Sequence, residues 1–90
     1  MERNLYAVKD RLNGFLSPFL DMSDASAKRG FLHSMHNAQP DSLFFTHPED
    51  YSLYKLGAFE TESGKLISLP TPQFICEAYT EVYEDETKCC

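Results

Sequence analysis

Long apolar runs, tryptophan and paired cysteines are what this 90-residue sequence lacks. A membrane-spanning helix needs about 20 consecutive apolar residues, and no stretch approaches that length, so we expect no membrane association. The three cysteines are Cys76, in an apolar run, and Cys89 and Cys90 at the end. This odd count lacks the spacing of a secreted disulfide framework, and residues 1–11 lack the composition of a signal peptide. The sequence therefore indicates a protein of a reducing cytoplasm.

Glycine is scarce, and its positions argue against a phosphate-binding loop. The four glycines are widely separated: Gly14, Gly30, Gly57 and Gly64. No serine or cysteine stands in a recognisable nucleophile motif. His33 and His36 would share one face of a helix, but a strong zinc signature needs two paired ligand clusters. We therefore expect a protein that binds rather than an enzyme, with no cofactor and no metal.

Basic residues are outnumbered, 8 to 14, which gives a net charge of −6. Proteins that coat nucleic acid without sequence preference carry a strongly basic surface, so this activity is disfavoured. A local basic face remains an open alternative, because five of the eight basic residues lie in the first third of the chain: Arg3, Lys9, Arg11, Lys28 and Arg29.

Aromatic residues are plentiful, with seven phenylalanines and five tyrosines. A chain of this length buries only about 60–65% of its unfolded surface, and each aromatic side chain can bury roughly 150–250 Å². We therefore expect most of these rings in the core.

Residues 4–20 predict a β-hairpin. Leu5 to Val8 suit a strand, and the pair Asn13-Gly14 is a strong turn signal. An apolar run follows, but Pro18 cannot donate a hydrogen bond within a sheet, which indicates an edge strand or a bulge there.

Residues 23–37 predict a helix. Ser23 is a good N-cap, and Asp24 suits the positive end of the helix dipole. Asn37 is a suitable end point. One apolar stripe follows the helical repeat: Ala27, Phe31, Leu32 and Met35. Gly30 weakens the helix, and we expect it to allow a close approach to the sheet.

A second hairpin is predicted after a loop over residues 39–50. Residues 51–60 have no cleanly polar face, which favours a central strand. A polar turn over 61–65 leads to a partner strand at 66–69. Beyond Pro70 and Pro72, residues 74–82 predict a last strand or a short helix.

The predicted order is thus β-β-α-β-β plus a terminal element. It corresponds to an α+β fold in which one helix packs on a face of an antiparallel sheet made of two β-hairpins. We expect one domain over residues 1–82. Residues 83–90 form an acidic tail, expected to be disordered and solvating, although competition with DNA for a basic site or binding of a basic partner is an alternative.

His47, Pro48, Glu49 and Asp50 bring an imidazole and two carboxylates together. One interpretation is a general acid–base pair. The other is a turn, because Pro48 presets the backbone for one and the acids solvate it. The turn is the interpretation that we favour.

The first hairpin offers a possible surface for single-stranded DNA. Arg3, Lys9 and Arg11 flank Tyr6 and Phe15, and many single-strand binders stack bases on aromatic rings between cationic side chains. On the predicted helix, Lys28 and Arg29 are further candidates for contact with phosphate or a partner. An ordinary hairpin with solvated charges is the competing interpretation.

A family resemblance rests on three parts of the sequence. They are Ala27-x-Arg29-x-Phe31, then His-Pro-Glu-Asp-Tyr-Ser-Leu-Tyr-Lys-Leu-Gly-Ala-Phe-Glu over residues 47–60, and then Gly64. Together with the pair Pro18-Phe19, it resembles the small nonstructural protein of gokushovirus-type microviruses, which are single-stranded DNA phages. The resemblance covers about residues 4–70 and does not include the tail.

This resemblance implies a protein made in the cytoplasm of the infected bacterium and acting in genome replication or in the switch to single-strand synthesis and packaging. The implied partner is a phage replication or assembly protein or a host replication factor, with single-stranded DNA as the alternative and a homodimer as an option. Gly57 is expected to mark a bulge or a close approach. Arg29 is expected to pair with Glu49 or Asp50, or to contact a phosphate or partner.

Overall fold

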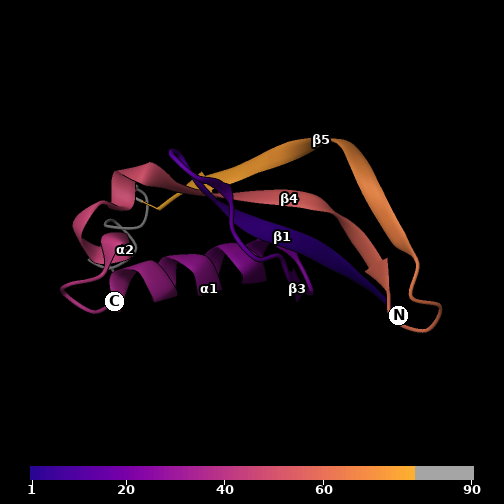
Figure 1. The fold of residues 1–90 in the computed structure, drawn as a ribbon. Coiled ribbons are helices and arrows are strands. Elements are labelled where there is room, and N and C mark those ends of the chain that lie inside the picture. Colours follow the sequence, from indigo (N-terminus) through magenta and orange to yellow (C-terminus); the bar gives the residue numbers. More distant parts are fainter. Residues whose placement is uncertain (79–90) are drawn as a thin grey trace.

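The computed structural model describes residues 1–78 and shows a curled antiparallel sheet with one long helix against one face (Figure 1). This confirms the α+β class and the order β-β-α-β-β. The elements in chain order are β1 (Glu2–Asp10), β2 (Gly14–Phe15), β3 (Phe19–Asp21), α1 (Asp24–His36), α2 (Leu43–Thr46), the 3₁₀ turn η1 (Pro48–Asp50), β4 (Tyr51–Glu60) and β5 (Leu66–Glu77). The end of the predicted terminal element and the acidic tail lie outside the described residues.

The sheet has the strand order β2-β1-β4-β5, with β3 pairing with β1 on the same side as β2. Gly14 allows the tight turn after β1, because its φ of +88° is one that other residues rarely adopt. The Asp10 carboxylate accepts hydrogen bonds from the Leu12 N–H at 3.0 Å and from the Asn13 side-chain amide at 2.8 Å. Pro18 lies where the return strand is interrupted between β2 and β3, as its chemistry predicted.

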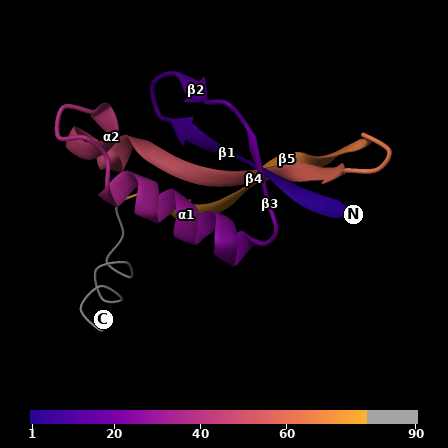
Figure 2. The ribbon, with the colours of Figure 1, turned by 90° about the horizontal axis from the view of Figure 1, so that it is seen from below.

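Helix α1 begins and ends where the sequence indicates. The Ser23 hydroxyl accepts a hydrogen bond from the Ser26 N–H at 3.1 Å, and Asn37 is the C-cap. The predicted stripe is buried against the sheet: Ala27, Phe31, Leu32 and Met35. Figure 2 shows α1 lying across the sheet on the side of β3. Gly30 does not provide the expected close approach, because a Cβ atom there would meet no atom within 4 Å.

The segment predicted as a loop over 39–50 contains two helical turns. The Ser42 hydroxyl accepts a hydrogen bond from the Phe44 N–H at 3.0 Å and so caps α2. The Phe44 ring then lies edge-on to Tyr51, with centroids 4.7 Å apart. The loop prediction was wrong here because packing of an apolar side chain stabilises a helix that is too short to form by itself.

Strand β5 runs without a break through Pro70 and Pro72, where the sequence had suggested two separate elements. Both prolines are accommodated because β5 lies at the edge of the sheet. Pairing with β4 is irregular there, since the register jumps from Lys55↔Gln73 to Gly57↔Ser68.

Strand β4 is the central strand that the sequence predicts, and it carries a bulge. Its register with β1 passes from Tyr6↔Lys55 to Leu5↔Gly57, which leaves Leu56 as an extra residue. Before the bulge, the odd-numbered residues of β4 lie on the helix side of the sheet. After it, the even-numbered residues lie on that side. This change explains why residues 51–60 show no clean alternation.

Candidate nucleic-acid interface

The sheet has one face covered by α1 and one open face (Figure 1). Tyr6 on β1 and Leu53 on β4 are fully buried in the cluster that packs against the helix. Side chains alternate along a strand, so Lys9, three residues after Tyr6, and Tyr54, directly after Leu53, project from the opposite face. That open face is where a ligand has direct access to side chains on three adjacent strands and on β2.

Three aromatic rings form a row across the open face. Phe15 on β2 and Tyr54 on β4 have ring centroids 5.5 Å apart, and Tyr54 and Phe74 on β5 have centroids 5.7 Å apart. Both pairs are edge-to-face, with interplanar angles of 85° and 76°. Phe15 and Phe74 are 43% and 50% exposed, so the two ends of the row present apolar ring surface to solvent. We call these three residues the aromatic row.

Lys9 lies within the aromatic row. Its Nζ atom is 5.6 Å from the centroid of Phe15 and 5.6 Å from that of Tyr54, a distance at which a cation is attracted to a ring face. Strand pairing fixes this placement, because Lys9 lies opposite Phe15 on one side and opposite Ser52 on the other. A positive charge is therefore held among the rings.

Arg11 lies beside Lys9 and is tied to the turn before β4. Its Nη2 atom is 3.0 Å from the Asp50 carboxylate, and its backbone N–H donates to the Asp50 carbonyl oxygen at 2.9 Å. A shallow hollow of about 200 Å³ lies between these groups, with Glu49 and Glu77 also lining it. The hollow carries both signs of charge, with three carboxylates and two cations.

Tyr6 does not belong to this surface, although the sequence suggested that it did. The side chain is fully buried on the helix side of the sheet. Its hydroxyl donates to the Asp24 carboxylate at 2.5 Å and accepts from the Asn4 side-chain amide at 3.0 Å. Burial, followed by the hydrogen bond to Asp24, raises the pKa of Tyr6 to about 12. Tyr6 is a core residue, because the alternation of side chains along β1 places it on the helix side and Lys9 on the open face.

The remaining predicted basic residues are not brought together. Arg3 shares the parity of Lys9 but lies six residues away along β1, which is about 20 Å. Lys28 and Arg29 lie on α1, on the other side of the sheet. The expected pairing of Arg29 with Glu49 or Asp50 is wrong: Asp50 pairs with Arg11, and Arg29 is exposed, with no ion pair among residues 1–78.

The His47–Asp50 segment forms a turn at the end of α2. Pro48 opens the 3₁₀ turn η1, where its missing N–H costs nothing. His47 is exposed, and its Nδ1 atom is 2.8 Å from the Thr46 hydroxyl. Asp50 is directed to Arg11, and the hollow that Glu49 and Asp50 line does not include His47. The segment connects α2 to β4.

Gly57 is a position of close backbone approach, as expected. A Cβ atom on this residue would collide with the carbonyl oxygen of Ile67 on β5. The glycine lies next to the irregular stretch in the pairing of β4 with β5.

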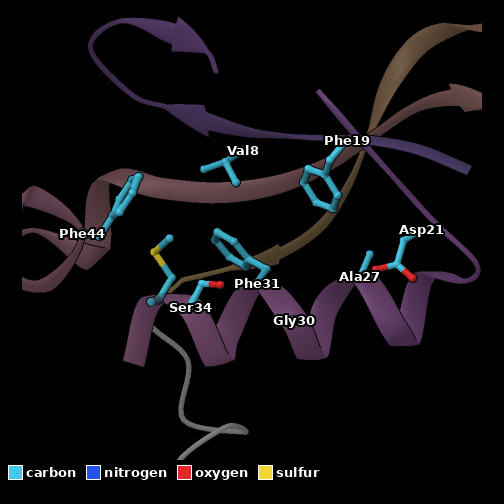
Figure 3. Close-up of a pocket in the computed structure, with 9 residues that line it drawn as sticks. Val8, Phe19, Asp21, Ala27, Gly30, Phe31, Ser34 and Phe44 are labelled. Atoms are coloured by element: carbon cyan, nitrogen blue, oxygen red, sulfur yellow. The ribbon is translucent and has the colours of Figure 1, made fainter. Parts of the chain in front are cut away.

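A second hollow lies on the helix side of the sheet (Figure 3). It is an apolar cleft of about 370 Å³ between α1 and the strands, and its lining includes Val8, Phe19, Phe31, Met35 and Phe44. Asp21 and Ser34 also line it. Cleft and aromatic row are on opposite faces of the sheet.

Two residues of the aromatic row, Tyr54 and Phe74, were missed by sequence reasoning. Both are separated in sequence from the first hairpin, and only strand pairing brings them beside Phe15. The available signal was the parity of Tyr54 relative to Leu53 in the predicted central strand. Phe74 gave no such signal, because the irregular pairing of β5 sets its direction.

Comparison with known proteins gives one family. A family model described as "Phage ORF5 protein" matches residues 3–81. No curated protein and no solved structure matches the chain. Within residues 1–78, no helix is long and apolar enough to span a bilayer.

Proposed function

The chain belongs to the phage ORF5 protein family, and we propose that it is a nonstructural protein that binds single-stranded DNA on the open face of its sheet. In this proposal it acts in the cytoplasm of the infected bacterium, in genome replication or in the switch to single-strand synthesis and packaging of a gokushovirus-type microvirus. The observation that carries the proposal is the aromatic row of Phe15, Tyr54 and Phe74 with Lys9 held between two of its rings.

The chemistry of the aromatic row suits unpaired bases. Every base has an apolar face that stacks on an aromatic ring, and such stacking contributes about 1–3 kcal/mol per base. Duplex DNA hides these faces, so the row selects single strands. Lys9 supplies a positive charge for the phosphate between stacked bases. The carboxylates of the neighbouring hollow and the net charge of −6 weaken the attraction to phosphate, so stacking carries most of the affinity.

A direct test compares Phe74→Ala with Leu43→Ala in binding to a fluorescent oligothymidylate. Phe74 is 50% exposed at the end of the aromatic row, whereas Leu43 is 62% exposed on α2 and away from it. Losing one stacked base weakens binding about 5- to 150-fold, given about 1–3 kcal/mol per base. Leu43→Ala should bind as the wild type does.

The variant Lys9→Gln tests the phosphate contact separately from base stacking, through the salt dependence of binding. Removing one phosphate contact should reduce the slope of log affinity against log salt by about 0.7, whereas Lys65→Gln, in the turn between β4 and β5, should leave it unchanged. Equal affinities for the wild type and Phe74→Ala, or no binding by the wild type at low salt, would remove this proposal.

A protein partner is the second candidate, and the apolar cleft favours it. The partner would be the phage replication or assembly machinery or a host replication factor. Ser34→Trp, which places a large ring at the cleft (Figure 3), should abolish crosslinking to these proteins in infected cells. Unchanged crosslinking by Ser34→Trp, or none by the wild type, would count against this candidate.

A further inference from the structure

The outer edge of β5 is the least protected part of the sheet. Within residues 1–78, β5 pairs with β4 and no strand pairs with its other side. Residues 66–74 contain no charged side chain, in a chain where about a quarter of the residues are charged. Leu66 is 64% exposed and Ile67 is 45% exposed. This edge therefore offers free backbone groups flanked by apolar side chains.

Natural edge strands are usually blocked by charged residues, by proline or by a covering element. In β5 the prolines at positions 70 and 72 block the middle of the strand, because neither can donate a hydrogen bond. The part over residues 66–69 has no such protection. It also lies at the end of the sheet that extends beyond α1, near the β4–β5 turn (Figures 1 and 2).

We propose that residues 66–69 of β5 pair with the same residues of a second copy, in antiparallel orientation about a two-fold axis. A second copy fits this edge because the same four residues, paired in antiparallel orientation, satisfy both chains at once. Two chains of net charge −6 repel each other over most of their surfaces, and this segment is uncharged, so they can approach here without bringing like charges together. Antiparallel self-pairing gives hydrogen-bond partners to the free backbone N–H and C=O groups of this edge and produces a closed dimer.

The dimer has a geometric consequence for the open face. A two-fold axis perpendicular to the sheet joins the two sheets into one, with both open faces on the same side. Phe74, the last ring of the aromatic row, lies on β5 itself. The two aromatic rows therefore belong to one continuous surface, and a single strand of DNA can run from one copy to the other. This consequence rests on the proposed function, whereas the dimer does not.

Analytical ultracentrifugation of the full chain tests the dimer. The wild type should sediment at twice its chain mass of 10.3 kDa at high micromolar concentration. The double variant Leu66→Lys/Ile67→Lys should sediment as a monomer and still unfold in a cooperative thermal melt, at a temperature that no longer depends on protein concentration. A matched control, Leu12→Lys/Leu43→Lys, adds the same charge at two exposed leucines outside this edge and should remain dimeric.

Three results would overturn the pairing: a monomeric wild type at every concentration, a dimeric edge variant, or an assembly larger than a dimer. The outcome is separable from that of DNA binding. A dimer that binds no oligothymidylate retains this inference and removes the proposed function, and a monomer that binds oligothymidylate does the reverse.

Discussion

The Tyr6 hydroxyl links the sheet to the start of α1. The hydroxyl donates to the Asp24 carboxylate in the first turn of the helix at 2.5 Å, and the Tyr6 side chain is fully buried. A hydrogen bond to a charged group contributes about 1.5–3 kcal/mol, so Tyr6→Phe should lower the free energy of unfolding by about this amount in urea. Tyr54→Phe removes a hydroxyl on the open face that has no hydrogen bond within residues 1–78, and it should change stability by less than about 0.5 kcal/mol. Equal losses in the two variants would show that the bond to Asp24 is not stabilising.

Asp10 makes stability depend on acid pH. The Leu12 N–H and the Asn13 amide hold its pKa below the usual value, because both donate to the ionised carboxylate. A carboxylate with a lowered pKa stabilises the folded state above its unfolded pKa of about 3.9. That stabilisation is lost as the pH falls from there through the lower folded pKa.

The free energy of unfolding should therefore fall less steeply below about pH 4 in Asp10→Asn than in the wild type. Urea titrations at several pH values measure this slope. Asp41→Asn, at an exposed carboxylate outside the sheet, is the control and should keep the wild-type slope. A wild-type slope in Asp10→Asn would contradict the prediction.

Glycine has opposite roles in two elements, and alanine substitutions separate them. In β4, a methyl group on Gly57 collides with the Ile67 carbonyl of β5, so Gly57→Ala should destabilise the protein by about 2 kcal/mol or more. In α1, Gly30→Ala meets no atom and should stabilise the helix by up to about 1 kcal/mol. Thermal melts of the two variants should shift in opposite directions. A melt for Gly57→Ala at or above that of the wild type would show that the β4–β5 approach relaxes freely.

Prediction from sequence succeeded for the elements whose determinants are local. Ser23, the apolar stripe and Asn37 define α1 within one continuous segment, and Asn13-Gly14 defines the first turn. It failed where the face of the sheet to which a side chain points depends on pairing with a strand that is distant in sequence. The parity of Tyr6 could not be assigned until β1 was placed against β4, and the continuity of β5 through Pro70 depends on its position at the sheet edge.

The candidate site shows the same limit. Lys9 and Phe15 were identified because both belong to the first hairpin, where one turn fixes their relation. Tyr54 joins them through long-range pairing of β1 with β4, and the parity of one strand does not reveal which strand lies beside it. Arg11 pairs with Asp50, one of the two carboxylates that the sequence had offered as partners for Arg29.

At the scale of the whole molecule, charge opposes the proposed binding to DNA. Residues 83–90 contain three acidic residues and one lysine, a net charge of −2 out of the total of −6. Removing these residues should therefore raise the affinity for oligothymidylate at low salt, and the difference should shrink as salt screens the charges. Anisotropy titrations of the full chain and the truncated chain at several salt concentrations measure it. An affinity that falls on truncation would mean that the tail assists binding.

The bulge at Leu56 also predicts how the chain tolerates change. Before it, along β4, positions that face α1 alternate with positions that face solvent, and after it the two sets exchange parity. A scan of all substitutions scored for folding should therefore show sensitivity with a period of two residues, and the phase should reverse at this point. Deleting Leu56 would remove the bulge and leave residues 57–60 opposite their present β1 partners, so it should be tolerated better than deleting Ser52, which shifts the register by one residue and turns Tyr51 away from α1.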